Sequence, residues 1–143
     1  MTNRMVTGMI DGELLAMQPS PSTDDDSGSV VRATAASGAS ASLRAVAGIM
    51  SNNGTVNQNT FGVAMNVVGC ITPVKFTVGG APASSAEIGL PVYLSTTEGA
   101  ATMTAPSASG EAIVRVGFLN RYPANSAGNY FVQFMPQFIG LIP

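Results

Sequence analysis

The sequence contains no histidine and only one cysteine among its 143 residues. Without an imidazole the chain cannot assemble a Ser-His-Asp or Cys-His catalytic pair, and it lacks a common zinc ligand. A single thiol cannot form an internal disulfide, and Cys70, within "NVVGCITPV", is expected to be a buried structural residue. We therefore assign no catalytic residue, no metal site and no cofactor, and we expect a protein that is not an enzyme.

Charge is also scarce. Charged residues make up 10% of the chain, against about 25% in a typical soluble domain. The net charge is −2, and the six cations are scattered from Arg4 to Arg121, which argues against binding of nucleic acid. Lys75, the only lysine, is expected to be a surface charge or a member of a salt bridge.

Long apolar runs are missing as well. No uninterrupted run approaches the roughly 20 residues that a membrane-spanning helix needs, because Gly, Pro or Ser interrupts every candidate. Asp11 and Glu13 stand where a signal peptide would require a continuous apolar core. We expect neither a membrane protein nor a secreted one.

Short strand-like segments fill the chain downstream of Gly28. They carry Val or Ile and are separated by turn residues, among which Asn53-Gly54 and Glu98-Gly99 are clear signals. Residues 89–110 are expected to form a hairpin around Glu98-Gly99, since the preceding "LPVYLS" alternates apolar and other side chains. The expected strands are "SVVRAT", "SLRAVAGIM", "TFGVAMNVVGCI", "VKFTV", "LPVYLS", "ATMTA", "AIVRVGFL" and "NYFVQFM". The pattern predicts an all-β fold, with a compact β-sandwich or barrel-like body over residues 29–143.

The first 28 residues differ from the rest of the chain in hydrophobic pattern and composition. Residues 1–18 show no clean hydrophobic period, and Gly8 and Gly12 disfavour a helix. Residues 19–28, "PSPSTDDDSG", are typical of an exposed acidic Pro/Ser linker. We expect an extended N-terminal arm that contacts another chain through apolar side chains. These are Met5, Val6, Met9, Ile10, Leu14, Leu15 and Met17.

One enzymatic hypothesis comes from Asp26-Ser27-Gly28. Aspartic proteases place a catalytic Asp in such a turn, and two of these carboxylates share a proton across a dimer. An apolar strand should directly precede that Asp, but Asp24-Asp25 and the linker stand there instead. A solvated loop is the favoured interpretation, and the dimeric protease remains a remote alternative.

A family resemblance comes from the last part of the chain. The segment "GLPVYLSTTEGAATMTAPSASGEAIVRVGFL" followed by "NYFVQFMPQF" resembles the small head decoration, or cement, proteins of tailed bacteriophages. It covers mainly residues 89–138. The shared pattern consists of Gly89, Pro91 to Ser95, Gly99, Ala105-Pro106, Gly110, Val116 to Phe118 and an aromatic strand that ends near Pro136.

The resemblance implies a virion structural protein. Its members are compact β-modules that form homotrimers on the outer surface of the capsid, bind the major capsid protein, bridge neighbouring capsomers and stabilise the expanded shell. It implies synthesis in the host cytoplasm and no nucleic-acid, membrane or small-molecule partner, and it makes the arm a capsid or subunit interface. Related β-modules occur in fibres and tails, so an adhesin module that binds a host receptor or glycan is the alternative.

Overall fold

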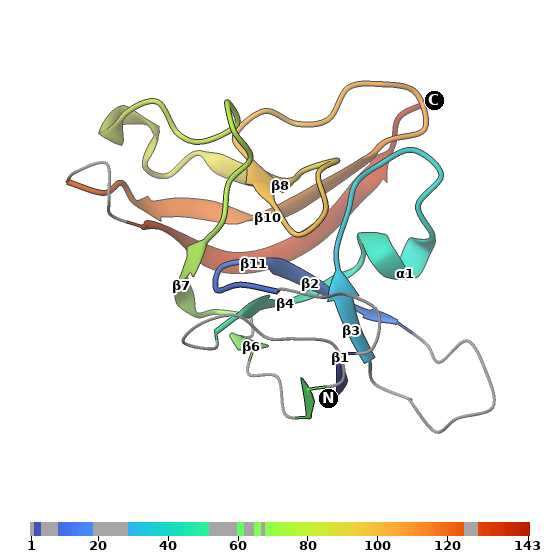
Figure 1. The fold of residues 1–143 in the computed structure, drawn as a ribbon. Helices are drawn as coiled ribbons and strands as arrows, with labels where there is room; N and C mark the ends of the chain where they lie inside the picture. The colour runs from blue at the N-terminus through green and yellow to red at the C-terminus, as the bar shows by residue number, and fades with distance from the viewer. Residues whose placement is uncertain are drawn as a thin grey trace.

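A computed structural model describes residues 2–3, 9–18, 29–51, 60–61, 65–66, 68–124 and 129–143. Within these ranges the chain is all-β, as expected, and its helices are the four-residue α1 (Ala41–Arg44) and the 3-10 turn η1 (Ser85–Glu87). Figure 1 shows two main sheets, with β8, β10 and β11 on one side and β2, β3 and β4 on the other.

The larger sheet has five antiparallel strands in the order β7-β11-β10-β8-β9. Its centre is the long β10–β11 hairpin, in which Val114 and Val132 point inward and are buried. The expected hairpin around Glu98-Gly99 is confirmed, because β8 pairs with β9 and Leu94 lies opposite Ala101. The strands are β7 (Ile71–Val74), β8 (Pro91–Leu94), β9 (Ala101–Thr102), β10 (Ala112–Arg121) and β11 (Tyr130–Leu141).

The smaller sheet has four antiparallel strands in the order β3-β2-β4-β6. They are β2 (Leu14–Gln18), β3 (Ser29–Arg32), β4 (Val46–Met50) and β6 (Met65–Asn66). A separate two-stranded pair consists of β1 (Thr2–Asn3) and β5 (Thr60–Phe61). The expected strand over residues 42–50 is shorter than its pattern, because its first residues form α1 and only Val46–Met50 joins the sheet.

The main core lies between the two sheets. Leu14 and Ile49 of the smaller sheet meet Leu94, Val114 and Phe134 of the larger one in a single buried cluster. A second cluster involves the opposite side of β2 and contains Met9, Leu15, Val30 and Met50. Burial of apolar side chains from two facing sheets is the main stabilisation of such a sandwich.

The expected arm is corrected by this arrangement. β2 is an interior strand, with Leu15 opposite Arg32 of β3 and Leu14 opposite Ile49 of β4. Leu14 and Leu15 are fully buried, each in a different cluster, so both sides of β2 are covered. A strand buried on both sides shows a continuous apolar run instead of alternation, which is why its pattern had no clean period. Residues 14–18 thus belong to the β body, while the linker at 19–28 lies outside the described residues.

Candidate functional site

Three of the seven expected interface residues are not available to a partner. Met9, Leu14 and Leu15 are fully buried, and Met17 is partly buried against the second cluster. Ile10 alone among the described members is exposed. Met5 and Val6 lie outside the described residues, so their proposed contact stays a prediction. The structure brings Met9, Leu15 and Met17 together, but as part of the protein's own core.

A buried carboxylate binds two cations at the junction of the sheets. Glu13 is 1% exposed; its Oε1 lies 2.7 Å from Lys75 Nζ, and its Oε2 accepts a 2.8 Å hydrogen bond from Arg32 Nε. The backbone N–H of Ile10 also donates to Oε2. A buried charge is tolerated only when it is paired and hydrogen-bonded, and this carboxylate meets both conditions.

The strands place these three charges together. Glu13 directly precedes β2, Arg32 ends β3 and Lys75 directly follows β7 of the other sheet. The salt-bridge role considered for Lys75 is confirmed. In the sequence Glu13 served only as evidence against a signal peptide, although one signal of its role was present: it is an acid directly before the apolar run of β2.

A tight turn over residues 10–13 fixes the carboxylate. The N–H of Gly12 donates to the carbonyl of Met50, and the N–H of Lys75 donates to the carbonyl of Gly12, so the turn is bonded to both sheets. Gly12 has a φ of +83°, and a Cβ at this position would lie 2.9 Å from the Lys75 backbone nitrogen. Glycine is therefore required here by both backbone conformation and close approach.

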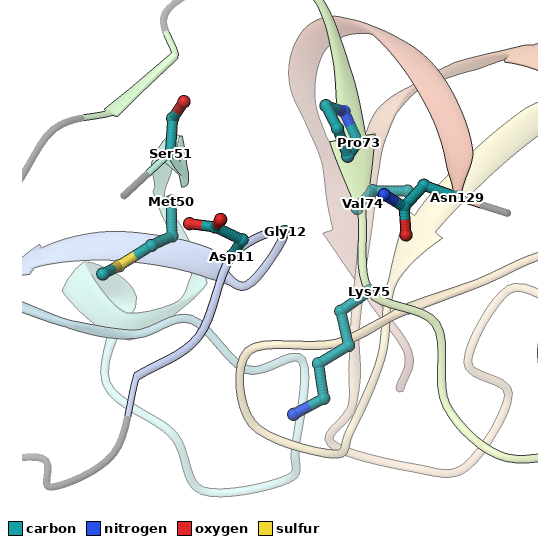
Figure 2. A pocket seen from close by; sticks show the side chains of 8 residues that line it. All are labelled: Asp11, Gly12, Met50, Ser51, Pro73, Val74, Lys75 and Asn129. Carbon is teal, nitrogen blue, oxygen red and sulfur yellow. The ribbon is translucent and has the colours of Figure 1, made fainter. Parts of the chain in front are cut away.

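A pocket of about 400 Å³ opens beside this turn (Figure 2). It lies where the smaller sheet meets β7, and Figure 2 shows the Lys75 side chain running away from the Asp11 carboxylate. The lining offers one carboxylate, one hydroxyl and one amide, which can hydrogen-bond but contain no nucleophile–base pair. The lining residues are Asp11, Gly12, Met50, Ser51, Pro73, Val74, Lys75 and Asn129.

The remaining chemical candidates do not assemble into a site. Cys70 is a partly exposed free thiol, less buried than expected. In the described ranges no three of the residues His, Cys, Asp and Glu come together as possible metal ligands. Asp26 lies outside those ranges, so the protease alternative stays a prediction. No helix in the described part of the chain is long and apolar enough to cross a membrane.

The second half of β11 presents an apolar strand with a free edge. Its first residues pair with β7 through Gln133, and Phe134 exchanges hydrogen bonds with Gly69 and Cys70. Beyond Phe134, no described strand pairs with β11 on the side away from β10. We call residues 135–141 the open edge. Their exposed apolar side chains are 42–56% accessible: Met135, Phe138, Ile139 and Leu141.

Comparisons with known proteins identified no relative of this chain. No protein-family model matches the chain, and neither a curated protein nor a solved structure matches it.

Proposed function

We propose that this protein is a virion structural protein that decorates the outer surface of a tailed-phage head. In this role it binds the major capsid protein, bridges neighbouring capsomers and stabilises the expanded shell. The observation that carries the proposal is the open edge, an exposed apolar segment of β11 that pairs with β10 on one side and with no described strand on the other. The resemblance of residues 89–138 to phage decoration proteins supports the same role.

An exposed apolar strand needs a partner. Soluble monomers protect such edges with charged residues, bulges or covering segments, since unpaired backbone groups otherwise attract another chain. Here the open edge carries no charge, because no charged residue follows Arg121. Pro136 and two register shifts with β10 interrupt its regularity, but its apolar side chains stay exposed. Apolar surface without charge is typical of the centre of a protein interface.

The interior of the protein also supports a mechanical role. The two sheets are joined by a large shared core and by the Glu13 cluster, which ties β2, β3 and the end of β7 together. A protein that binds only the expanded shell stabilises that state by mass action, and a homotrimer that holds several capsomers gains strength from multivalency. The expected location is the capsid surface, after synthesis in the host cytoplasm.

The pocket beside the turn over residues 10–13 supports an alternative to the decoration role. Its carboxylate, hydroxyl and amide groups are of the kind that hydrogen-bond to sugar hydroxyls. A fibre or tail adhesin module that binds a host glycan would use such a concave polar site.

Sedimentation with phage heads tests the proposal. The purified full-length chain is mixed with expanded and unexpanded heads of the phage that encodes it, both lacking the protein. We expect saturable binding to expanded heads, greater heat resistance of those heads, and a trimer in light scattering. Failure to bind either form, or immunogold labelling confined to the tail, would contradict the decoration role and favour the adhesin.

A pair of variants tests the open edge in the same assay. Phe138→Ser should weaken binding by about tenfold, which corresponds to about 1.4 kcal/mol. Val78→Ser is the matched control, because Val78 is fully exposed and lies outside β11. Equal loss in both variants would show that the open edge has no special part in attachment.

A further inference from the structure

The outer side of the five-stranded sheet gathers both arginines of β10. In a regular strand, residues three apart point to opposite sides. Register shifts between Arg115 and Gly117 and between Leu119 and Arg121 change this alternation. As a result Arg115, Phe118 and Arg121 all point away from the core.

Neighbouring strands extend this surface. Phe118 lies opposite Gln133 of β11, which in turn lies opposite Ile71 of β7. Phe131 and Met135 share the side of Gln133, since Val132 and Phe134 between them are buried in the core. We call this surface the arginine face, defined by Ile71, Arg115, Phe118, Arg121, Phe131 and Met135.

Both guanidinium groups are held over aromatic rings. The Arg115 Cζ lies 4.7 Å from the centroid of the Phe118 ring, and the Arg121 Cζ lies 5.4 Å from that of Phe131. Such stacking orients the planar guanidinium group and leaves its N–H donors free to bind an acceptor. The rings thus hold both guanidinium groups in place while their N–H groups stay available to a partner.

Neither arginine has an acidic partner in the described part of the chain. Arg32 and Lys75 pair with Glu13, and Arg44 donates to the carbonyls of Ala36 and Gly110. By contrast Arg115 and Arg121 make no hydrogen bond or ion pair there, and Nε of Arg115 is buried without an acceptor. The donors left for a partner are therefore the terminal N–H groups of the two guanidinium groups.

The charge of this face points to an acidic partner. The five strands of the larger sheet contain two arginines and no Asp or Glu, although the whole protein has a net charge of −2. Aromatic residues, Met and Arg are enriched at protein interfaces, whereas Asp, Glu and Lys are depleted. A nucleic acid is disfavoured, because binding to phosphates usually relies on many cations and this face has two.

We propose that the arginine face binds a carboxylate-bearing surface of the shell protein. This inference rests on the decoration role and specifies the chemistry of its partner. Each guanidinium group forms paired N–H···O hydrogen bonds with an Asp or Glu of the shell, while Ile71 and Met135 cover apolar surface beside it.

Arginine variants test the inference with expanded heads. Arg115→Gln and Arg121→Gln should each weaken binding by about tenfold. Lysine at the same positions should restore less than half of the lost binding free energy, because it keeps the charge but not the planar fork. Val78→Ser, an exposed change that lies outside the arginine face, is the control and should bind like the unchanged protein. Thermal unfolding of each variant checks that the fold is intact.

Chemical protection gives a second readout that needs no variant. Phenylglyoxal modifies accessible arginines, and mass spectrometry locates the adducts. Binding to heads should protect Arg115 and Arg121 at least about fivefold, given that an interface excludes water from its centre. Unprotected arginines, or glutamine variants that bind heads as tightly as the unchanged protein, would overturn the inference while the decoration role stands.

A head-free titration separates failure of the inference from failure of the proposed function. If the unchanged protein does not bind heads, the decoration role fails and the face is tested with poly-L-glutamate and single-stranded DNA. Stronger binding of poly-L-glutamate that is lost in the double glutamine variant would support a carboxylate-binding face. Equal or stronger binding of DNA, or binding of poly-L-glutamate unaffected by the double variant, would reject it.

Discussion

Lys75 Nζ lies 2.7 Å from Glu13 Oε1, and this contact joins the two sheets of the sandwich. The lysine directly follows β7 of the larger sheet, whereas the glutamate directly precedes β2 of the smaller one. Arg32 binds the other carboxylate oxygen. A single buried acid therefore holds cations from both sheets, and several stability effects depend on it and on the turn that carries it.

Glu13→Gln should destabilise the protein strongly. The change removes the negative charge between two cations, and we expect a loss of about 2 to 3 kcal/mol in the free energy of unfolding. The loss should be below that of a fully buried pair, because the Lys75 side chain is 40% exposed. Urea unfolding followed by circular dichroism measures it. Glu98→Gln, an exposed acid in the β8–β9 turn, is the control, and equal midpoints for the two variants would contradict the role of Glu13.

Leu14→Ala should show that β2 is an interior strand. Leu14 is fully buried in the main core, and truncation of such a leucine typically costs about 3 kcal/mol. Ile10→Ala is the control from the same segment, since Ile10 is 39% exposed and should cost less than about 1 kcal/mol. Thermal and urea unfolding compare the two. Similar small losses would mean that residues 9–18 form a separate arm after all.

Gly12→Ala and Gly38→Ala separate backbone strain from close approach. Both glycines have positive φ, so each substitution should cost about 1 kcal/mol for the left-handed conformation. At Gly38 no atom lies within 4 Å of an added Cβ, whereas at Gly12 the Cβ would press on the Lys75 backbone. We therefore expect Gly12→Ala to cost at least about twice as much as Gly38→Ala. The difference in urea midpoint measures this, and its absence would show that the turn can move away from β7.

The parts of the fold that were predictable depend on local signals. The β8–β9 hairpin follows from the alternation of Val92 and Leu94 with their neighbours and from the Glu98-Gly99 turn. β10 and the first half of β11 carry long apolar patterns and were also expected, whereas β11 continues to Leu141, beyond the expected end near Pro136. In these segments neighbours in sequence are neighbours in the sheet, so the sequence pattern contains most of the relevant contacts.

The parts that were missed depend on distant residues. β2 is covered on both sides by residues from later strands, and no local pattern shows that Leu14 will meet Ile49. The Glu13 cluster joins residues 19 and 62 positions apart. The arginine face needs two register shifts along β10, which the alternation of a regular strand does not reveal. The candidate interface was affected accordingly, because Met9, Leu14 and Leu15 proved to be core residues.

The central position of β2 also determines when it can fold. Its backbone is completed by β3, by β4 and by the carbonyl of Gly99, which accepts a hydrogen bond from the N–H of Leu14. A ribosome makes β2 long before Gly99, so the apolar run at residues 14–17 must wait for most of the chain to be synthesised. Sheets that depend on such distant pairings fold slowly and expose apolar segments meanwhile. β2 is therefore synthesised early relative to its hydrogen-bonding partners but is secured late, and its apolar run stays exposed to other chains in the interval.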